Sequence, residues 1–289
     1  MRGRCSAVLI ALLVALAGVA AAPAMAQGVR CDRGDLARVR DVYLAAQAAG
    51  DPIKLPLADF TAYSEQMEDA TLFGGAIAKP MKIGLSRSIL DVPGCTTFVL
   101  VIADDAASPR VIGARLQFSG RDNPIAPSRT NDIETIVTAP GDWLFDGPRA
   151  LAAARAEDWR EIPAADRDSR AAIVAAADAY LDALGRAGAT IPWAASCERI
   201  EGGAVFGRNG EACDAGLPGS LKARDRRYIV DESVGAVAVL LTLGDAKFPD
   251  AHVFRVEKGR IRYVHALSVC RNGTCAQPAT PALKARLAG

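Results

Sequence analysis

The stretch AHVFRVEKGRIRYVHALSVC, residues 251–270, predicts a β-hairpin that contains the only two histidines of the chain. Two runs of β-branched and aromatic residues flank a turn at Lys258-Gly259. With these two residues as the turn, apolar residues oppose each other, whereas a three-residue turn would set them against arginines. The opposed pairs are then Val256 with Ile261, Phe254 with Tyr263, and His252 with His265.

This register places both histidines on the apolar face of the hairpin. The side-chain period of two puts His265 on the face that also carries Ile261, Tyr263, Leu267 and Val269. His252 lies across the ladder, with the two Cβ atoms about 5 Å apart. Because burying two imidazoles without partners is costly, the pair indicates either two hydrogen-bonded core residues or a functional site.

The first 26 residues have the features of a Sec-type secretory signal peptide. Arg2 and Arg4 precede an apolar run at residues 7–22, and Ala24-Met25-Ala26 forms a small-residue cleavage site. We therefore expect cleavage after Ala26 and a periplasmic or secreted protein. No later stretch is long enough to span a bilayer, so we expect no integral membrane segment in the mature chain.

Composition argues against nucleic acid as a partner. The 289-residue chain has a formal net charge of +1, and its 34 basic and 33 acidic residues are scattered along it. Hydrophobic residues make up 51%, which is enough for a sizeable core in one large domain or two modest ones.

The cysteines predict disulfides. Cys5 leaves with the signal peptide, and six cysteines remain for an oxidising compartment. Fifteen pairings are possible; we favour pairs that stay within one half of the chain. These pairs are Cys31–Cys95, Cys197–Cys213 and Cys270–Cys275. A metal site is the alternative, but the chain has no C-x-x-C motif.

The chain also contains an internal repeat. Four segments return in the same order at a nearly constant spacing: residues 43–46 as 180–183, 55–56 as 191–192, 63–65 as 199–201, and 87–91 as 227–231. Each copy reads as a helix, a connection with a proline, a short segment with a glutamate, and a four-strand antiparallel meander. We therefore predict an α+β fold of two tandem units.

The units and their bridge have predicted bounds. They are 1–26 for the signal peptide, 27–145 for the first unit, 146–170 for a bridging helical segment and 171–289 for the second unit. In the second unit the strands are predicted at 227–231, 236–243, 251–256 and 260–269. We expect helices on one face of each sheet, a pocket on the other, and the two units packed as an internal pseudo-dimer.

Several motifs resemble a secreted family of uncharacterised function within the SnoaL-like, nuclear transport factor two-like superfamily. They are C-E-R-I-E-G-G at 197–203, R-R-Y-I-V-D-E at 226–232, G-R-I-R-Y-V-H-A-L-S-V-C at 259–270 and D-W-L-F at 142–145. The resemblance implies a helix over a bent antiparallel sheet that encloses a cone-shaped apolar pocket with a few acid/base residues. Members of the superfamily include lyases, isomerases and hydrolases, and also proteins that only bind or assemble.

The second copy has the better equipped pocket. Its candidate residues are His265, His252, Tyr263, Asp231, Tyr228 and Glu201, with Arg199 and Trp193 beside them, whereas the last strand of the first copy offers Glu134 and no histidine. Such a set suits a cofactor-independent lyase or isomerase that acts on a small hydrophobic substrate. His265 would move the proton, a tyrosine would stabilise the oxyanion and a carboxylate would orient the imidazole.

Other interpretations remain open. Asp231 and Asp91 each precede a turn, where aspartate caps its own backbone, and Glu201 recurs as Glu65 and can serve structure in both copies. The protein can instead be a binding module without turnover, for a small apolar molecule or another protein. A third hypothesis is a metal site formed by His252 and His265 with a carboxylate such as Glu201 or Asp250. Otherwise we expect no cofactor.

Overall fold

The computed structural model describes residues 30–123, 125, 128–208, 210–277, 281–285 and 287. The predicted signal peptide lies outside the described residues. Among the described residues, no helix is long and apolar enough to cross a membrane.

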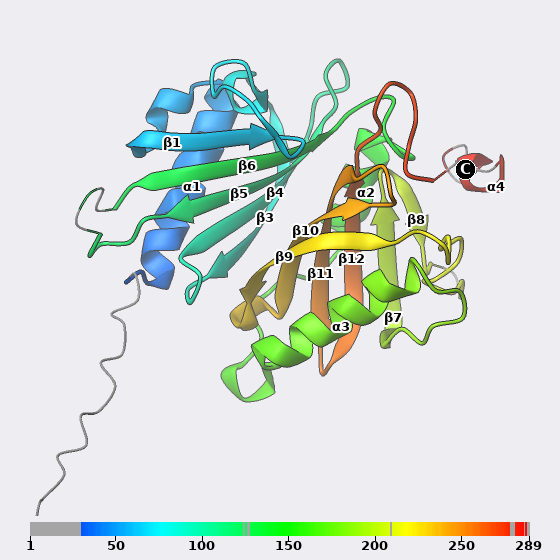
Figure 1. The fold of residues 1–289 in the computed structure, drawn as a ribbon. Coiled ribbons are helices and arrows are strands. Elements are labelled where there is room, and N and C mark those ends of the chain that lie inside the picture. The colour runs from blue at the N-terminus through cyan, green and yellow to red at the C-terminus, as the bar shows by residue number, and fades with distance from the viewer. Residues whose placement is uncertain are drawn as a thin grey trace, which may run out of the picture.

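The first unit begins with a helix and continues as a six-stranded sheet (Figure 1). Its elements are α1 (Arg33–Ala49), β1 (Leu57–Glu65), β2 (Glu68–Asp69), β3 (Ile83–Asp91), β4 (Thr96–Ala103), β5 (Val111–Phe118) and β6 (Thr130–Thr138). Short 3-10 helices cover Pro52–Lys54 and Ala76–Ala78.

The second unit repeats this order. Its elements are α3 (Arg170–Ala183), β7 (Trp193–Glu201), β8 (Ala204–Phe206), β9 (Ala223–Asp231), β10 (Ala236–Leu243), β11 (Phe248–Glu257) and β12 (Arg260–Ser268). The bridge between the units holds α2 (Gly147–Arg155) and a 3-10 helix at Ala164–Asp166, and a short helix α4 (Pro281–Ala285) follows the second sheet. The predicted repeat and the four predicted strands of the meander are confirmed.

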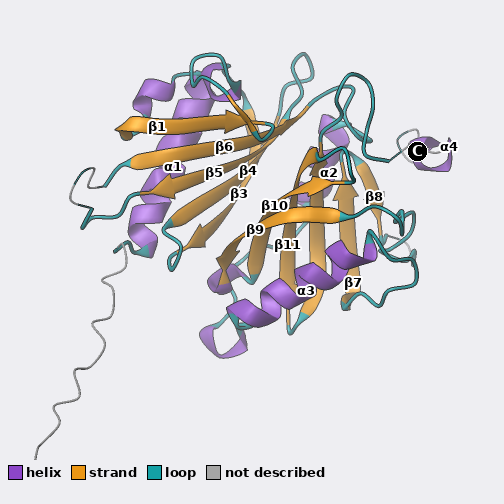
Figure 2. Ribbon diagram, in the orientation of Figure 1, coloured by secondary structure: helices purple, strands orange, loops and turns teal. Residues whose placement is uncertain are grey.

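The two sheets have matching topologies. Their strand orders are β2-β1-β6-β5-β4-β3 and β8-β7-β12-β11-β10-β9. The prediction of purely antiparallel sheets is wrong, because β1 pairs parallel to β6 and β7 pairs parallel to β12. The short segment with a glutamate, predicted in each copy, is a full strand, β1 in the first unit and β7 in the second. Each lies beside the last strand of its meander. The result is an α+β fold with two mixed sheets (Figure 2).

The layers follow from which faces are apolar. One face of the first sheet packs against α1, and one face of the second packs against α3. The opposite faces meet each other, as Phe98 and Leu100 of β4 share one core with Ala238 of β10 and Val253 of β11. All eight residues of β4 and of β10 are buried, which explains their continuous apolar sequence.

The hairpin of residues 251–270 forms with its predicted turn, and its predicted register holds only beside that turn. Lys258 and Gly259 have φ values of 55° and 67°, so Glu257 pairs with Arg260 and Val256 with Ile261. A β-bulge at Arg262 then shifts the ladder by one residue. Beyond it, Arg255 pairs with Tyr263, Val253 with His265, and His252 with Ala266.

The bulge has a physical cause. Ile261 and Val264 are both fully buried on the α3 side of the sheet. A strict alternation would place them on opposite faces, because they are three residues apart. The extra residue restores both to one face and lets the Arg262 guanidinium reach the backbone oxygen of Ser196 at 3.0 Å. The predicted opposition of His252 and His265 is therefore wrong.

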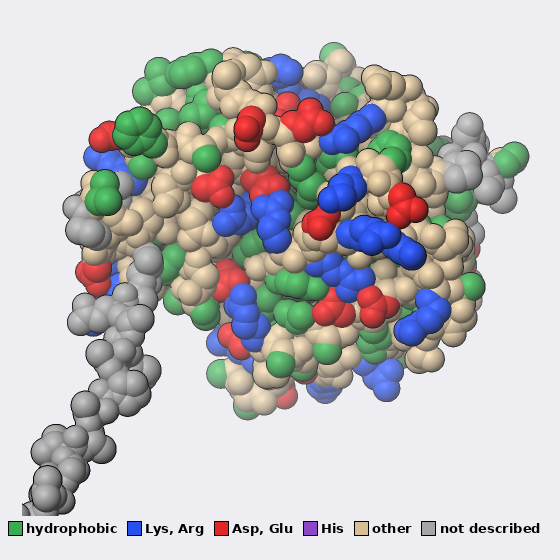
Figure 3. Space-filling view, in the orientation of Figure 1, with side chains coloured by type: hydrophobic (Ala, Val, Ile, Leu, Met, Phe, Trp, Pro, Cys, Tyr) green, Lys and Arg blue, Asp and Glu red, His purple; other side chains and the backbone are tan. Residues whose placement is uncertain are grey.

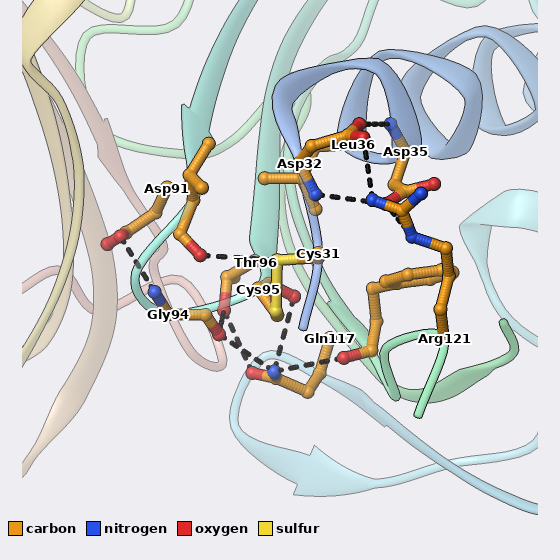
Figure 4. The surroundings of a disulfide bond; sticks show 12 residues. Cys31, Asp32, Asp35, Leu36, Asp91, Gly94, Cys95, Thr96, Gln117 and Arg121 are labelled. Atoms are coloured by element: carbon orange, nitrogen blue, oxygen red, sulfur yellow. Dashed lines mark hydrogen bonds and ion pairs between the residues drawn. A yellow bond between two sulfur atoms is a disulfide. The ribbon is translucent and has the colours of Figure 1, made fainter. Parts of the chain in front are cut away.

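All three predicted disulfides are confirmed: Cys31–Cys95, Cys197–Cys213 and Cys270–Cys275. They indicate an oxidising compartment. Figure 4 shows that Cys31 leads into α1 while Cys95 lies in the turn before β4. The adjoining Asp32 caps the helix by accepting the backbone N–H of Asp35 at 2.9 Å. The first disulfide thus ties the start of the helix to the sheet that it covers.

Candidate functional site

The bulge divides the predicted site residues between the two faces of the second sheet. Ladder partners share a face, so His252 lies in one row with Tyr228 and Glu201 on the α3 side. His265 and Tyr263 point the other way, toward the boundary between the units. The six candidates therefore do not assemble into one pocket.

On the α3 side, His252 is held by a carboxylate. Its Nδ1 lies 2.6 Å from Oδ1 of Asp250, and Asp250 also accepts the hydroxyl of Ser268. The imidazole packs between aromatic rings, with centroids 5.5 Å from Tyr180 and 5.8 Å from Phe254. His252 is 2% exposed, so the dyad is sealed inside the core.

Arg199 and Glu201 form a second buried pair on the same face. Arg199 bonds to Glu201 and donates Nε to the backbone oxygen of Cys213 at 2.8 Å, while the Trp143 indole donates to Glu201 at 3.2 Å. Burial is the largest single effect and lowers the pKa of Arg199, but the interactions with Glu201 and Tyr180 together outweigh it, so the pKa of Arg199 is raised. Its guanidinium also lies over the ring of Phe206.

The first unit closes the equivalent space in the same way. Tyr63 and Glu65 occupy the positions of Arg199 and Glu201, and the Tyr63 hydroxyl donates to Glu65 at 2.7 Å. Glu65 in turn accepts the backbone N–H of Ala76 at 2.6 Å. In both units the pair anchors the loop that follows, which is the structural role anticipated for the recurring glutamate. Side chains of the protein itself thus fill the space between helix and sheet.

On the boundary side, His265 is held by a residue of the bridge. Its Nε2 lies 2.8 Å from Oε2 of Glu157, and the same oxygen accepts the indole N–H of Trp159 at 2.8 Å. The Tyr263 hydroxyl accepts the backbone N–H of Asp158 at 3.3 Å. His265 is 3% exposed, so this dyad too is shielded from solvent.

Two arginines complete this boundary cluster, which we define as Arg87, Glu157, Trp159, Arg255, Tyr263 and His265. Arg87 from β3 and Arg255 from β11 each place a guanidinium carbon 5.9 Å from the Trp159 ring centroid. Burial lowers the pKa of Arg87, and the nearby Glu157 carboxylate opposes that shift. The cluster contains residues of both units and of the bridge.

The remaining candidates have structural partners. Tyr228 donates to Asp178 of α3 at 2.6 Å. Burial is the larger cause and this bond the smaller one, and together they raise the pKa of Tyr228 to about 12. Asp231 caps the turn after β9 by accepting the backbone N–H of Ser233 at 3.1 Å. It also accepts two bonds from Arg33 of the first unit. Trp193 packs edge-on against Tyr180 at 5.8 Å.

The metal hypothesis fails on geometry. His252 and His265 lie on opposite faces of the sheet, so they cannot be ligands of one ion. Among the described residues, no group of three or more His, Cys, Asp or Glu side chains is arranged to hold a metal.

An open pocket lies instead where the bridge meets the end of the second sheet. Its volume is about 830 Å³. Its lining comprises Gly141, Asp142, Trp143, Leu144, Phe145, Gly273, Thr274, Cys275, Gln277 and Leu287. Sequence reasoning used D-W-L-F only as a family motif and did not assign it to a site. The apolar composition of that motif, directly before a proline-containing helix start, was the available signal.

Glu157 and Trp159 were also missed as site residues. They lie in a charged, alanine-rich bridge that reads as a solvated surface. The tryptophan among those charges was the one local sign that the segment is partly buried.

One family model matches part of the chain. Residues 166–268, which contain α3 and β7 to β12, match the model of a domain of unknown function, DUF8021. The match covers the second unit as far as the end of β12 and assigns no activity. No curated protein matches the chain.

Proposed function

We propose that the chain is an exported, SnoaL-like protein that binds a small apolar or aromatic molecule without turning it over. The observation that carries this proposal is the pocket at residues 141–145 and 273–277. Its volume of about 830 Å³ falls within the range of small-molecule sites. Two aromatic residues, Trp143 and Phe145, are among those that line it.

The wall formed by residues 142–145 is held rigidly. Cys270 donates its backbone N–H to Asp142 at 2.7 Å, and Trp143 donates its own to the backbone oxygen of Ser268 at 3.3 Å. A Cβ atom on Gly202 would lie 2.3 Å from the backbone oxygen of Leu144, so only glycine permits this close approach. A preformed wall lowers the entropy cost of binding.

A second part of the lining comes from the loop closed by Cys270–Cys275. Arg271 and Thr274 form an isolated β-bridge inside this loop, with backbone N–O distances of 2.7 and 2.9 Å. The disulfide therefore closes the short loop between Cys270 and Cys275, which are five positions apart. Cys275 itself also lines the pocket. Such a loop keeps its shape in the oxidising compartment where we propose the protein acts.

The buried dyads support binding over catalysis. A general acid or base must come within hydrogen-bond reach of the substrate. His252 is closed off by Tyr180 and Phe254, and His265 by Glu157 and Trp159. Neither histidine lines the 830 Å³ pocket.

One observation favours the alternative, a lyase or isomerase that uses His265. Glu157 is hydrogen-bonded to the His265 imidazole, which is the arrangement by which a carboxylate orients a catalytic histidine. Under this alternative, His265→Ala abolishes turnover of a substrate that wild type converts. Turnover that survives in His265→Ala would eliminate it.

The proposal is tested by a thermal-shift screen of hydrophobic carbonyl, phenolic and terpenoid compounds. A ligand at 100 times its Kd stabilises a protein by about 2.7 kcal/mol, which is several degrees of melting temperature. We expect a compound that stabilises wild type and shifts Phe145→Ala much less. If no compound shifts wild type, or if every stabilising compound acts equally on Phe145→Ala, the pocket is not the binding site.

A further inference from the structure

An open groove lies on the second unit, where the end of α3 meets the start of β9. Its volume is about 320 Å³. The charged residues of its lining are Arg186, Lys222, Arg224, Arg226 and Asp182, which is four cations against one carboxylate. Figure 3 shows Lys and Arg side chains gathered over this part of the molecule, where Figure 1 places β9 beside α3. The groove thus concentrates positive charge on a chain whose 34 basic and 33 acidic residues nearly balance.

Two of the four cations are already paired with carboxylates. Arg226 donates to Asp178 and to Asp182 of α3, in both cases at 2.7 Å, and its side chain is 17% exposed. Arg224 donates to Asp245 at 2.8 Å, but the Asp245 side chain is 90% exposed and water weakens such a pair. The Arg226 guanidinium is therefore held in a fixed orientation at the groove, and Arg224 is only loosely held.

The other two cations, Arg186 and Lys222, have no carboxylate partner. Both side chains line the groove and both residues are exposed. Neither makes an ion pair with any residue that the structure describes. Because like charges that share a groove repel each other, an arrangement of this kind favours the uptake of an anion. Two unpaired cations match an anion with a charge of about −2.

The first unit has the same lysine with its charge neutralised. Lys82 and Lys222 are equivalent, since their backbone oxygens accept the N–H groups of Asp104 and Gly244, each at 2.8 Å, and both pairs of residues are 140 positions apart. The Lys82 ammonium also pairs with the Asp104 carboxylate at 3.3 Å. Glycine at position 244 removes that carboxylate from the second unit. The second unit has therefore kept the cation and lacks its counterion.

We propose that this groove is a binding site for a phosphate group, either inorganic phosphate or a small phosphate monoester. At neutral pH a phosphate monoester carries a charge between about −1.5 and −2 and offers three acceptor oxygens. A guanidinium donates two parallel hydrogen bonds to such a group, and an ammonium adds a point charge. Arg186, Arg224 and Arg226 would supply the paired donors, and Lys222 the point charge.

This site is separate from the pocket of about 830 Å³. The two share no lining residue, and the groove belongs to the end of α3 instead of the bridge. The inference therefore does not rest on the proposed binding of an apolar molecule, and either one can fail without the other.

The test is isothermal titration calorimetry with inorganic phosphate, with glucose 6-phosphate and with succinate, all at one ionic strength set with sodium chloride. We expect at least one of the two phosphates to bind wild type, and succinate to bind more weakly. Arg186→Gln and Lys222→Gln should each weaken phosphate binding about ten-fold, because each removes a charge-assisted hydrogen bond. Lys82→Gln is the matched control at the equivalent position and should leave the affinity unchanged.

The two phosphates distinguish the sources of the ligand. Tighter binding of inorganic phosphate supports a site for the free ion, and tighter binding of glucose 6-phosphate supports a site for a phosphorylated small molecule. The proposal is overturned if neither phosphate binds wild type, or if succinate binds as tightly as they do. It is also overturned if Arg186→Gln and Lys222→Gln bind as wild type does, or if Lys82→Gln loses as much affinity as they do.

Melting temperatures in chloride alone separate binding from folding. Cations near the C-terminal end of a helix can instead stabilise its dipole. If Arg186 and Lys222 wait for an anion, their glutamine variants should melt within about 2 °C of wild type without phosphate. Phosphate should then raise the melting temperature of wild type more than that of the variants. Variants that melt several degrees lower in chloride would overturn the proposal, because the lost affinity would then reflect a disturbed end of α3.

Discussion

Asp91 and Asp231 are equivalent residues, and each accepts the backbone N–H of the residue that precedes the other. Asp91 accepts from Val230 at 2.9 Å and Asp231 from Leu90 at 3.0 Å. Each is also bound by the first arginine of the other unit's helix: Arg170 donates to Asp91 and Arg33 to Asp231. The two units are thus joined by a reciprocal, isologous contact, as in a two-fold dimer.

We predict that Asp91→Ala and Asp231→Ala destabilise the protein by similar amounts, about 2–4 kcal/mol each. Both carboxylates are 2–3% exposed and lose charge-assisted bonds, although their arginine partners remain partly hydrated. Urea unfolding measures the difference. Asp245→Ala, at a side chain that is 90% exposed, is the control and should stay within about 0.5 kcal/mol of wild type. A large effect at only one of the two aspartates would contradict the symmetry.

The Arg199–Glu201 pair should be strongly coupled. Glu201→Leu leaves the buried Arg199 guanidinium without its counterion and should cost about 3–5 kcal/mol. The double variant Arg199→Met with Glu201→Leu removes both charges and should be more stable than Glu201→Leu alone. A double-mutant cycle from urea unfolding gives the coupling, and simple additivity would show that the pair is not the anchor of its loop.

The two histidines should act independently. They lie on opposite faces, His252 with Asp250 and His265 with Glu157. A double-mutant cycle of His252→Ala and His265→Ala should therefore give a coupling energy below about 0.5 kcal/mol. The cycle of His252→Ala with Asp250→Ala should give about 1 kcal/mol or more. Strong coupling between the histidines would contradict this arrangement and support the register without a bulge, in which the two residues oppose each other.

Tyr228 should ionise late in an alkaline titration. Burial and the bond to Asp178 raise its pKa from 10 to about 12. A raised pKa in the folded protein means that the stabilisation is complete below pH 10 and is lost as the pH rises through about 12. Phenolate absorbance of wild type and Tyr228→Phe isolates this residue. Ionisation of Tyr228 near pH 10 would contradict the hydrogen bond.

The sequence predicted the fold where a local pattern determines it. The repeated segments located α1 and α3, and the predicted strand at 236–243 matched β10 to the residue. The three disulfides followed from pairing within each half. These features depend on near neighbours in the chain or on equivalence between the copies.

The site depended on information that no local pattern carries. A single bulge at Arg262 reversed the face of His252 relative to His265, and period-two reasoning cannot place a bulge before the packing of Ile261 and Val264 is known. Glu157 reaches His265 across 108 residues of sequence. Alternation indicates which residues share a face, but it does not show which distant side chain meets them.

Isothermal titration of the best ligand from the thermal-shift screen tests the central claim most directly. The titration compares wild type, Phe145→Ala in the pocket wall and Tyr228→Phe on the α3 face, with melting curves to confirm that both variants are folded. The account predicts that Phe145→Ala weakens binding about ten-fold and that Tyr228→Phe leaves the affinity unchanged. Unchanged binding in Phe145→Ala together with lost binding in Tyr228→Phe would contradict it, because the ligand would then lie between α3 and the sheet.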